Sequence, residues 1–165
     1  MDFGTAISTC LGKYAVFNGR ARRSEYWFFF LFCTLVDFGA DIVEGVLNAA
    51  TQVPVPIATI VSLALFLPSF AAAVRRLHDV GWSGWWWGAG YLLGFALAIL
   101  WFAAFVYVNF RLSAIFTNPL GVTALLSTLG AVGYAIMVFV LMVLPGTPST
   151  NRYGPDPKAP NVDVF

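Results

Sequence analysis

Three segments of more than twenty residues contain no charged side chain, and they constrain most strongly how this chain can fold. They are residues 53–74, 85–108 and 120–144. About 20 apolar residues in a helix cross the hydrocarbon core of a bilayer, so each segment is long enough to span a membrane. Charged residues make up 10% of the 165 residues and the mean hydropathy is +0.79, whereas soluble domains carry about 25% charged residues. The pattern predicts a single membrane domain over residues 1–165.

A fourth apolar segment, residues 26–47, differs in carrying acidic side chains. Asp37, Asp41 and Glu44 are spaced i, i+4 and i+7, which places them on one face of a helix. Asp37 would lie roughly 16 Å beyond Tyr26, near the middle of the bilayer, where a charge is costly. The face could be a proton or cation path, or it could be a polar cap that faces the external side, with Asp37 hydrogen-bonded to neighbouring helices. We favour the polar cap, because no Lys or Arg lies within any predicted span to partner these carboxylates and a relay needs further polar groups.

The two ends of the chain differ from the spans. Residues 1–17 place Phe3, Ile7, Leu11 and Tyr14 on one stripe, which is typical of a short amphipathic helix at the membrane surface. Residues 145–165 are rich in proline and glycine and predict an extended tail. Pro68 predicts a kink in the second span. The predicted fold is therefore an all-α integral membrane protein with four transmembrane helices, a short N-terminal interfacial helix and an extended C-terminal tail.

The positions of the nine cations predict the topology. Four lie before the first span, two follow the second span and two lie in the tail, whereas the opposite loops carry only Arg111. Cytoplasmic loops are enriched in Lys and Arg, so both termini and the segment after the second span should face the cytoplasm. Tryptophans 82 and 85–87, next to this segment, suit the membrane–water boundary. A multi-pass membrane protein with cytoplasmic termini is expected.

Three polar motifs fall on the predicted cytoplasmic side: F-N-G-R-A-R-R-S-E-Y-W at residues 17–27, R-R-L-H-D at 75–79 and N-R-Y-G-P-D-P at 151–157. Asp79 lies near the C-terminal end of a helix, where a carboxylate is unfavourable, so it requires a cation such as Arg75, Arg76 or an arginine of the first motif. His78 beside Asp79 resembles an acid–base pair, but adjacent helical residues diverge by about 100°. The sequence has no nucleophile motif or phosphate-binding loop, so we do not expect an enzyme.

These three motifs resemble those of a bacterial inner-membrane family known as domain of unknown function 805. The family pattern is F-x-G-R-x-x-R-x-E-Y-W, then R-R-L-H-D followed by S-G-W-W, then G-T-P-x-x-N-R-Y-G-x-D-P. The matches here are residues 17–27, 75–79 with 83–86, and 146–157, in the same order and over nearly the whole chain. The resemblance implies an inner-membrane location and an architecture of apolar helices, and it implies no activity.

Two hypotheses describe what the cytoplasmic motifs do. The favoured one is an internal clasp of salt bridges in a structural or partner-binding protein, because four carboxylates there can neutralise half of the eight cations. The alternative is a basic pocket for an anionic phospholipid headgroup or another phosphate-bearing ligand. The candidate residues for either role are Arg20, Arg23, Glu25, Arg75, Arg76, His78, Asp79, Asn151 and Arg152.

Expected partners are the lipid bilayer and either another membrane protein or a second copy of the chain. A net charge of +1 argues against nucleic acid. The two cysteines, Cys10 and Cys33, show no spacing typical of a zinc site or a disulfide framework, so neither is expected. No paired histidines suggest a prosthetic group, and no cofactor is expected.

Overall fold

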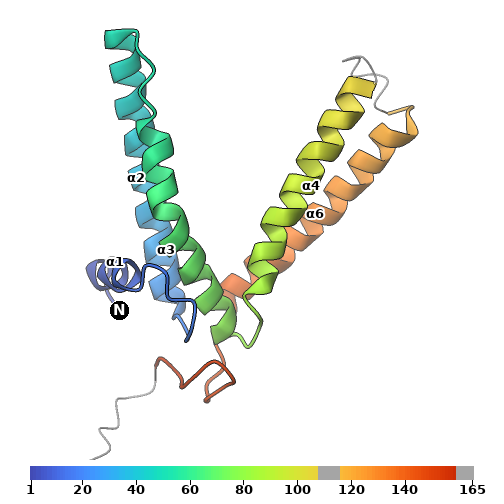
Figure 1. Ribbon diagram of the computed structural model, residues 1–165. Helices are drawn as coiled ribbons and strands as arrows, with labels where there is room; N and C mark the ends of the chain where they lie inside the picture. The colour runs from blue at the N-terminus through green and yellow to red at the C-terminus, as the bar shows by residue number, and fades with distance from the viewer. Residues whose placement is uncertain (108–115, 159–165) are drawn as a thin grey trace, which may run out of the picture. The chain divides into compact units, whose positions relative to one another are not determined.

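The computed structural model describes residues 1–107 and 116–158, and in this part of the chain every regular element is a helix (Figure 1). The elements are α1 (Phe3–Gly12), α2 (Arg23–Thr51), α3 (Ile57–Asp79), α4 (Trp85–Tyr107) and α6 (Pro119–Val143). The all-α prediction is confirmed. The chain forms two compact units: unit 1 contains residues 1–84 and the tail from Pro145, and unit 2 contains Trp85–Leu144.

Within the described residues, three helices are long and apolar enough to cross a membrane: α3, α4 and α6. The bounds of α4 and α6 agree with the predicted spans to within one residue. α2 is not among the three, and it differs from them in carrying four carboxylates. A total of four transmembrane helices therefore stays a prediction. Arg111 lies outside the described residues.

Two helix boundaries differ from the predicted ones. α2 extends beyond residues 26–47 at both ends. Its N-cap is Arg22 and its C-cap is Gln52. α3 begins at Ile57, after Pro54 and Pro56, and continues to Asp79 instead of ending at residue 74. The motif R-R-L-H-D thus forms the C-terminal end of α3 and does not lie in the segment that follows the helix. Its polar side chains are therefore carried by a helix.

In unit 1, α2 and α3 form a hairpin, and α1 packs against both of these helices (Figure 1). α1 starts at Asp2, whose side chain accepts the Thr5 amide at 2.9 Å, as an N-cap residue does. Ala6 and Cys10 of α1 are fully buried. On α3, residues 71–73 are all alanine and buried, so neighbouring backbone can approach closely. The predicted short N-terminal helix is present, and its place at the membrane interface stays a prediction.

The predicted acidic face of α2 lies partly against α3. Asp37 accepts a hydrogen bond from the Ser62 hydroxyl at 3.0 Å, and Glu44 accepts one from the Ala58 amide at 2.7 Å. The Ala58 amide belongs to the first turn of α3, where N–H groups have no helical acceptor. Asp41 is exposed. Two of the three carboxylates therefore contribute hydrogen bonds between helices.

Unit 2 is a hairpin of α4 and α6. Asn118 caps α6 by accepting the Leu120 amide at 3.0 Å. The Trp101 indole donates to the Thr128 hydroxyl at 2.9 Å, and the Tyr134 hydroxyl donates to a backbone carbonyl of α4. Most large apolar side chains of this hairpin are exposed. This surface suits a lipid environment.

Candidate functional site

The centre of the candidate site is the Asp79 carboxylate, at the last residue of α3. It is 2% exposed and accepts from two guanidinium groups. Arg20 approaches Oδ1 through Nε and Nη2, each at 2.9 Å, and Arg76 approaches Oδ2 through Nη1 at 2.5 Å. Both arginines are also buried. We call Asp79, Arg20 and Arg76 the Asp79 cluster. It links the first polar motif to the second through charge-assisted hydrogen bonds.

Arg20 also binds the C-terminal tail. Its guanidinium donates to the carbonyl of Ser149 at 2.6 Å, and further to the carbonyls of Thr147 and Gly154. In return, the amide and hydroxyl of Thr147 both donate to the Asp79 carbonyl, at 2.9 and 3.1 Å. These bonds satisfy a carbonyl at the end of α3 that has no helical donor. The third polar motif is therefore joined to the other two.

Close packing fixes the start of the tail against Asp79. Gly146 lies so near the carboxylate that an added Cβ would lie 2.5 Å from Asp79 Cγ. Only glycine fits this position, because any side chain would overlap the carboxylate. The glycine of the G-T-P motif is thus explained by the approach of backbone to a charged group.

A second buried pair lies beneath α1. Arg75 binds Glu25 at 3.2 Å, and the Cys10 thiol donates to the same carboxylate at a sulfur–oxygen distance of 3.8 Å. Arg75 also donates to the carbonyl of Val16 at 2.6 Å. Burial, followed by the nearby Glu25 charge, raises the pKa of Cys10 to about 12, so the thiol stays protonated. We call Cys10, Glu25 and Arg75 the Glu25 cluster; it fixes α1 to the hairpin.

His78 and Asn151 complete the site. The ring of His78 contacts Gly19 and Tyr153 rather than its neighbour Asp79. His78 Nδ1 lies 3.2 Å from the carbonyl of Gly19, and its ring stacks on Tyr153 with centroids 3.7 Å apart. Asn151 donates to the His78 carbonyl at 2.9 Å. None of the three contacts points to proton transfer. The contacts of Tyr153 and Asn151 hold the tail against the end of α3, and the contact of Gly19 joins the first motif to it.

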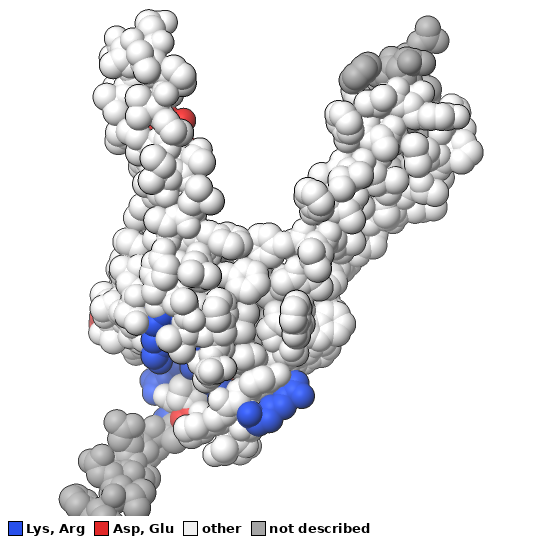
Figure 2. Space-filling view, in the orientation of Figure 1, with Lys and Arg blue, Asp and Glu red and all other residues white. Residues whose placement is uncertain are grey.

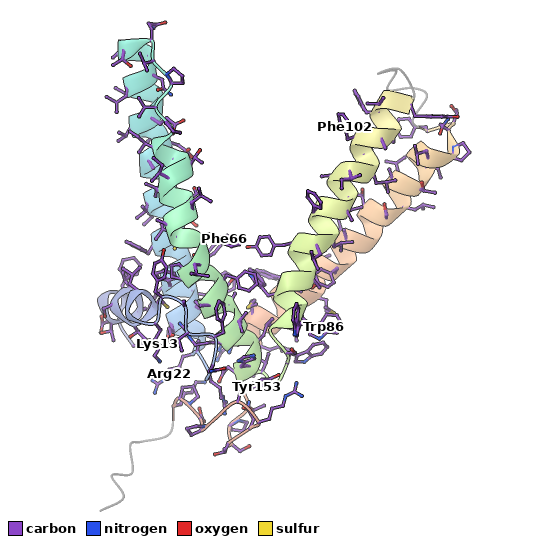
Figure 3. All side chains as sticks on the ribbon, viewed as in Figure 1. Lys13, Arg22, Phe66, Trp86, Phe102 and Tyr153 are labelled. Carbon is purple, nitrogen blue, oxygen red and sulfur yellow. The ribbon has the colours of Figure 1, made fainter. Side chains whose placement is uncertain are left out.

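The remaining two candidate cations lie on the exposed rim. Arg23 and Arg152 are exposed, and Arg152 stacks on the Tyr153 ring at 4.7 Å and donates to Gly81. Basic side chains gather at this end of unit 1 in Figure 2, and Figure 3 places Lys13, Arg22 and Tyr153 there. The site thus has a buried layer of paired charges and an exposed basic layer.

The structure confirms some of the predicted contacts and corrects others. Asp79 does pair with Arg76 and with an arginine of the first motif, but Arg75 pairs with Glu25 instead. Arg20, Glu25, Arg75, Arg76 and Asp79 are buried together, whereas His78 and Asn151 are half-buried and Arg23 and Arg152 are exposed. Sequence reasoning missed Cys10 and the carbonyls of the tail. The residues next to Cys10 in the sequence do not indicate that it contacts Glu25. The carbonyls of the tail could not be found either, because every residue has one.

Comparison with known proteins bears on this arrangement. The model of a family described as a protein of unknown function (DUF805) matches residues 14–155, which contain the first two polar motifs and the third as far as Pro155. The chain belongs to the DUF805 family. It is 31% identical to the Inner membrane protein YhaI of Escherichia coli (strain K12) over 148 residues, covering 90% of this chain and 91% of the relative. It is also 31% identical to the Inner membrane protein YhaH of the same strain, covering 90% and 92%. No solved structure matches.

Membership of DUF805 and the three apolar helices identify a bacterial inner-membrane protein. The family assigns no activity. The resemblance read from the three motifs is confirmed, and the buried charged residues Arg20, Glu25, Arg75, Arg76 and Asp79 lie within the matched range.

Proposed function

We propose that this DUF805 protein is a structural or partner-binding component of the inner membrane, without enzymatic activity, built around a cytoplasmic clasp. The clasp consists of the Asp79 cluster, the Glu25 cluster and the tail segment 145–157. The observation that supports it is the internal pairing of the buried cations. Arg20, Arg75 and Arg76 are at most 7% exposed, and each binds a carboxylate of the chain. A pocket for an external anion would leave at least one such donor accessible.

We further propose that α2 is a fourth span and that both termini are cytoplasmic. α3 has 23 residues and is about 34 Å long, enough to cross the bilayer. α2 packs along α3 as the other half of the hairpin, so it crosses wherever α3 crosses. The hydrogen bonds of Asp37 and Glu44 to α3 lower the cost of placing these carboxylates in the membrane. A fluorescent-protein fusion at residue 165 should fold and fluoresce, whereas export of the fusion would contradict this topology.

An anionic ligand remains the second candidate, and the exposed basic layer favours it. The two clusters bury three cations against two carboxylates, and Arg23 and Arg152 add exposed positive charge nearby. An anionic lipid headgroup would be attracted to such a surface. The conduit interpretation of Asp37, Asp41 and Glu44 gains no comparable support, since two of these three side chains bond to α3.

Native mass spectrometry distinguishes the clasp from the pocket. The wild type is compared with Arg76→Gln and with Arg152→Gln, which changes an exposed arginine at the same end of the protein. The clasp predicts that no anionic lipid is lost selectively, and that Arg76→Gln lowers the free energy of unfolding by about 3–5 kcal/mol. A phosphate-bearing ligand that is retained by wild type and lost from both folded variants would overturn the proposal in favour of the pocket.

A further inference from the structure

The middle of α3 contains a backbone carbonyl that has lost its helical partner. Pro68 lies inside α3 and is fully buried. Proline has no amide hydrogen, so the carbonyl four residues earlier, at Ala64, has no i+4 donor. Ala64 lies 15 residues before Asp79, which corresponds to about 22 Å along the helix. In a membrane-spanning α3 this depth has no water, so the carbonyl requires a donor from the protein.

The donor comes from the segment that follows α1. The Tyr14 hydroxyl donates to the Ala64 carbonyl, across 50 positions of the sequence. Arg75 fixes the backbone on both sides of Tyr14, by donating to the carbonyls of Lys13 at 3.3 Å and Val16 at 2.6 Å. A buried arginine of α3 therefore holds the backbone that carries Tyr14, and the Tyr14 hydroxyl reaches the break in the same helix.

We propose that Tyr14 is a positioning residue that docks α1 onto α3 by satisfying the carbonyl left free by Pro68. Pro68 leaves an unpaired carbonyl at one position along α3, at Ala64. The hydrogen bond from Tyr14 to this carbonyl fixes the position of α1 along the α3 axis. This coupling involves neither the Asp79 carboxylate nor the tail, and it shares only Arg75 with the clasp.

If Tyr14 made only an ordinary contact, the effect of removing its hydroxyl would not depend on the residue at position 68. Tyr14→Phe removes only the hydroxyl and should leave the Ala64 carbonyl unsatisfied. Pro68→Ala restores the amide, so the carbonyl regains a helical donor and the hydroxyl becomes dispensable. The effect of Tyr14→Phe should therefore depend on which residue occupies position 68.

A double-mutant cycle tests this dependence. In the native background, Tyr14→Phe should shift the folding equilibrium toward the unfolded state about fivefold to tenfold. In the Pro68→Ala background the shift should be less than about twofold. Pro68→Val, which also carries an amide, replaces Pro68→Ala if that variant does not fold. Tyr107→Phe, in α4, is the control for loss of a tyrosine hydroxyl.

Alkylation of Cys10 gives a second readout of α1 docking, in protein carrying Cys33→Ser. Cys10 lies on the buried face of α1 and is fully buried, so undocking of α1 should expose it. The labelling rate should rise at least about fivefold in Tyr14→Phe and fall back when Pro68→Ala is added. Equal effects of Tyr14→Phe on labelling and on unfolding in both backgrounds would overturn the proposal.

Discussion

Asp79→Asn removes one charge from the centre of the clasp while keeping the size of the side chain. In the wild type, the carboxylate is 2% exposed and forms ion pairs with both Arg20 and Arg76, which are 7% and 0% exposed. The variant leaves two buried guanidinium groups without a counter-charge. One of the two accepting oxygens also becomes an NH2 group, which cannot accept a hydrogen bond from a guanidinium.

The expected cost follows from this geometry. Removing one partner of a buried ion pair costs about 3–5 kcal/mol, since the remaining charge stays desolvated. The side chain of Asp79 is 3% exposed in both of its ion pairs, so water cannot replace the lost contact. Total stabilities are about 5–15 kcal/mol, so the variant should lose a large part of its stability.

The assay is equilibrium unfolding in detergent micelles, followed by tryptophan fluorescence. The matched control is Asp156→Asn, in the tail, where the carboxylate accepts the Lys158 amide at 2.9 Å in an exposed position. The control should change the free energy of unfolding by less than about 0.5 kcal/mol. Arg20→Gln and the double variant complete a cycle, and the double variant should cost less than the sum of the single ones. A cost for Asp79→Asn equal to that of Asp156→Asn would refute the clasp.

Two further predictions concern neighbouring positions. Gly146→Ala should lower the free energy of unfolding by about 1–3 kcal/mol, because the added Cβ overlaps Asp79. Unfolding measurements should show no such loss for the control Gly133→Ala, where an added Cβ would meet nothing within 4 Å. Equal effects of the two substitutions would show that the tail does not need this close approach. In Cys33→Ser protein, Cys10 should resist maleimide at pH 8 until the protein unfolds, because burial and Glu25 raise its pKa to about 12, and rapid labelling of the folded protein would contradict the buried cluster.

Sequence patterns were sufficient for the helices of this protein but only partly sufficient for its site. Uncharged runs longer than twenty residues allow little besides a helix in lipid, so α4 and α6 were placed to within one residue. The predicted second span ends at residue 74, where the uncharged segment ends, whereas α3 continues through the charged residues Arg75 and Arg76. Their charges are paired with Glu25 and Asp79, and burial in such pairs lets the helix continue to Asp79.

The pairing within the site could not be derived from spacing alone. Arg75 and Arg76 are both within helical reach of Asp79, and adjacent residues point in directions about 100° apart. Which of them faces Asp79 depends on where α1 and Glu25 lie, and the sequence does not specify this. The role of Arg20 as a donor to the tail depends on carbonyl groups, which every residue has. The pairing of Tyr14 with Pro68 likewise depends on the height at which α1 packs.

Hydrogen exchange of the tail tests the clasp most directly. The Thr147 amide donates to Asp79, and the amides of Asn151 and Gly154 are bonded to each other's carbonyls, at 3.1 and 3.0 Å. Residues 145–157 should therefore exchange slowly in the wild type and rapidly in Arg20→Gln, while α4 and α6 exchange alike in both. Exchange of the wild-type tail at the rate of an unstructured peptide would contradict the clasp.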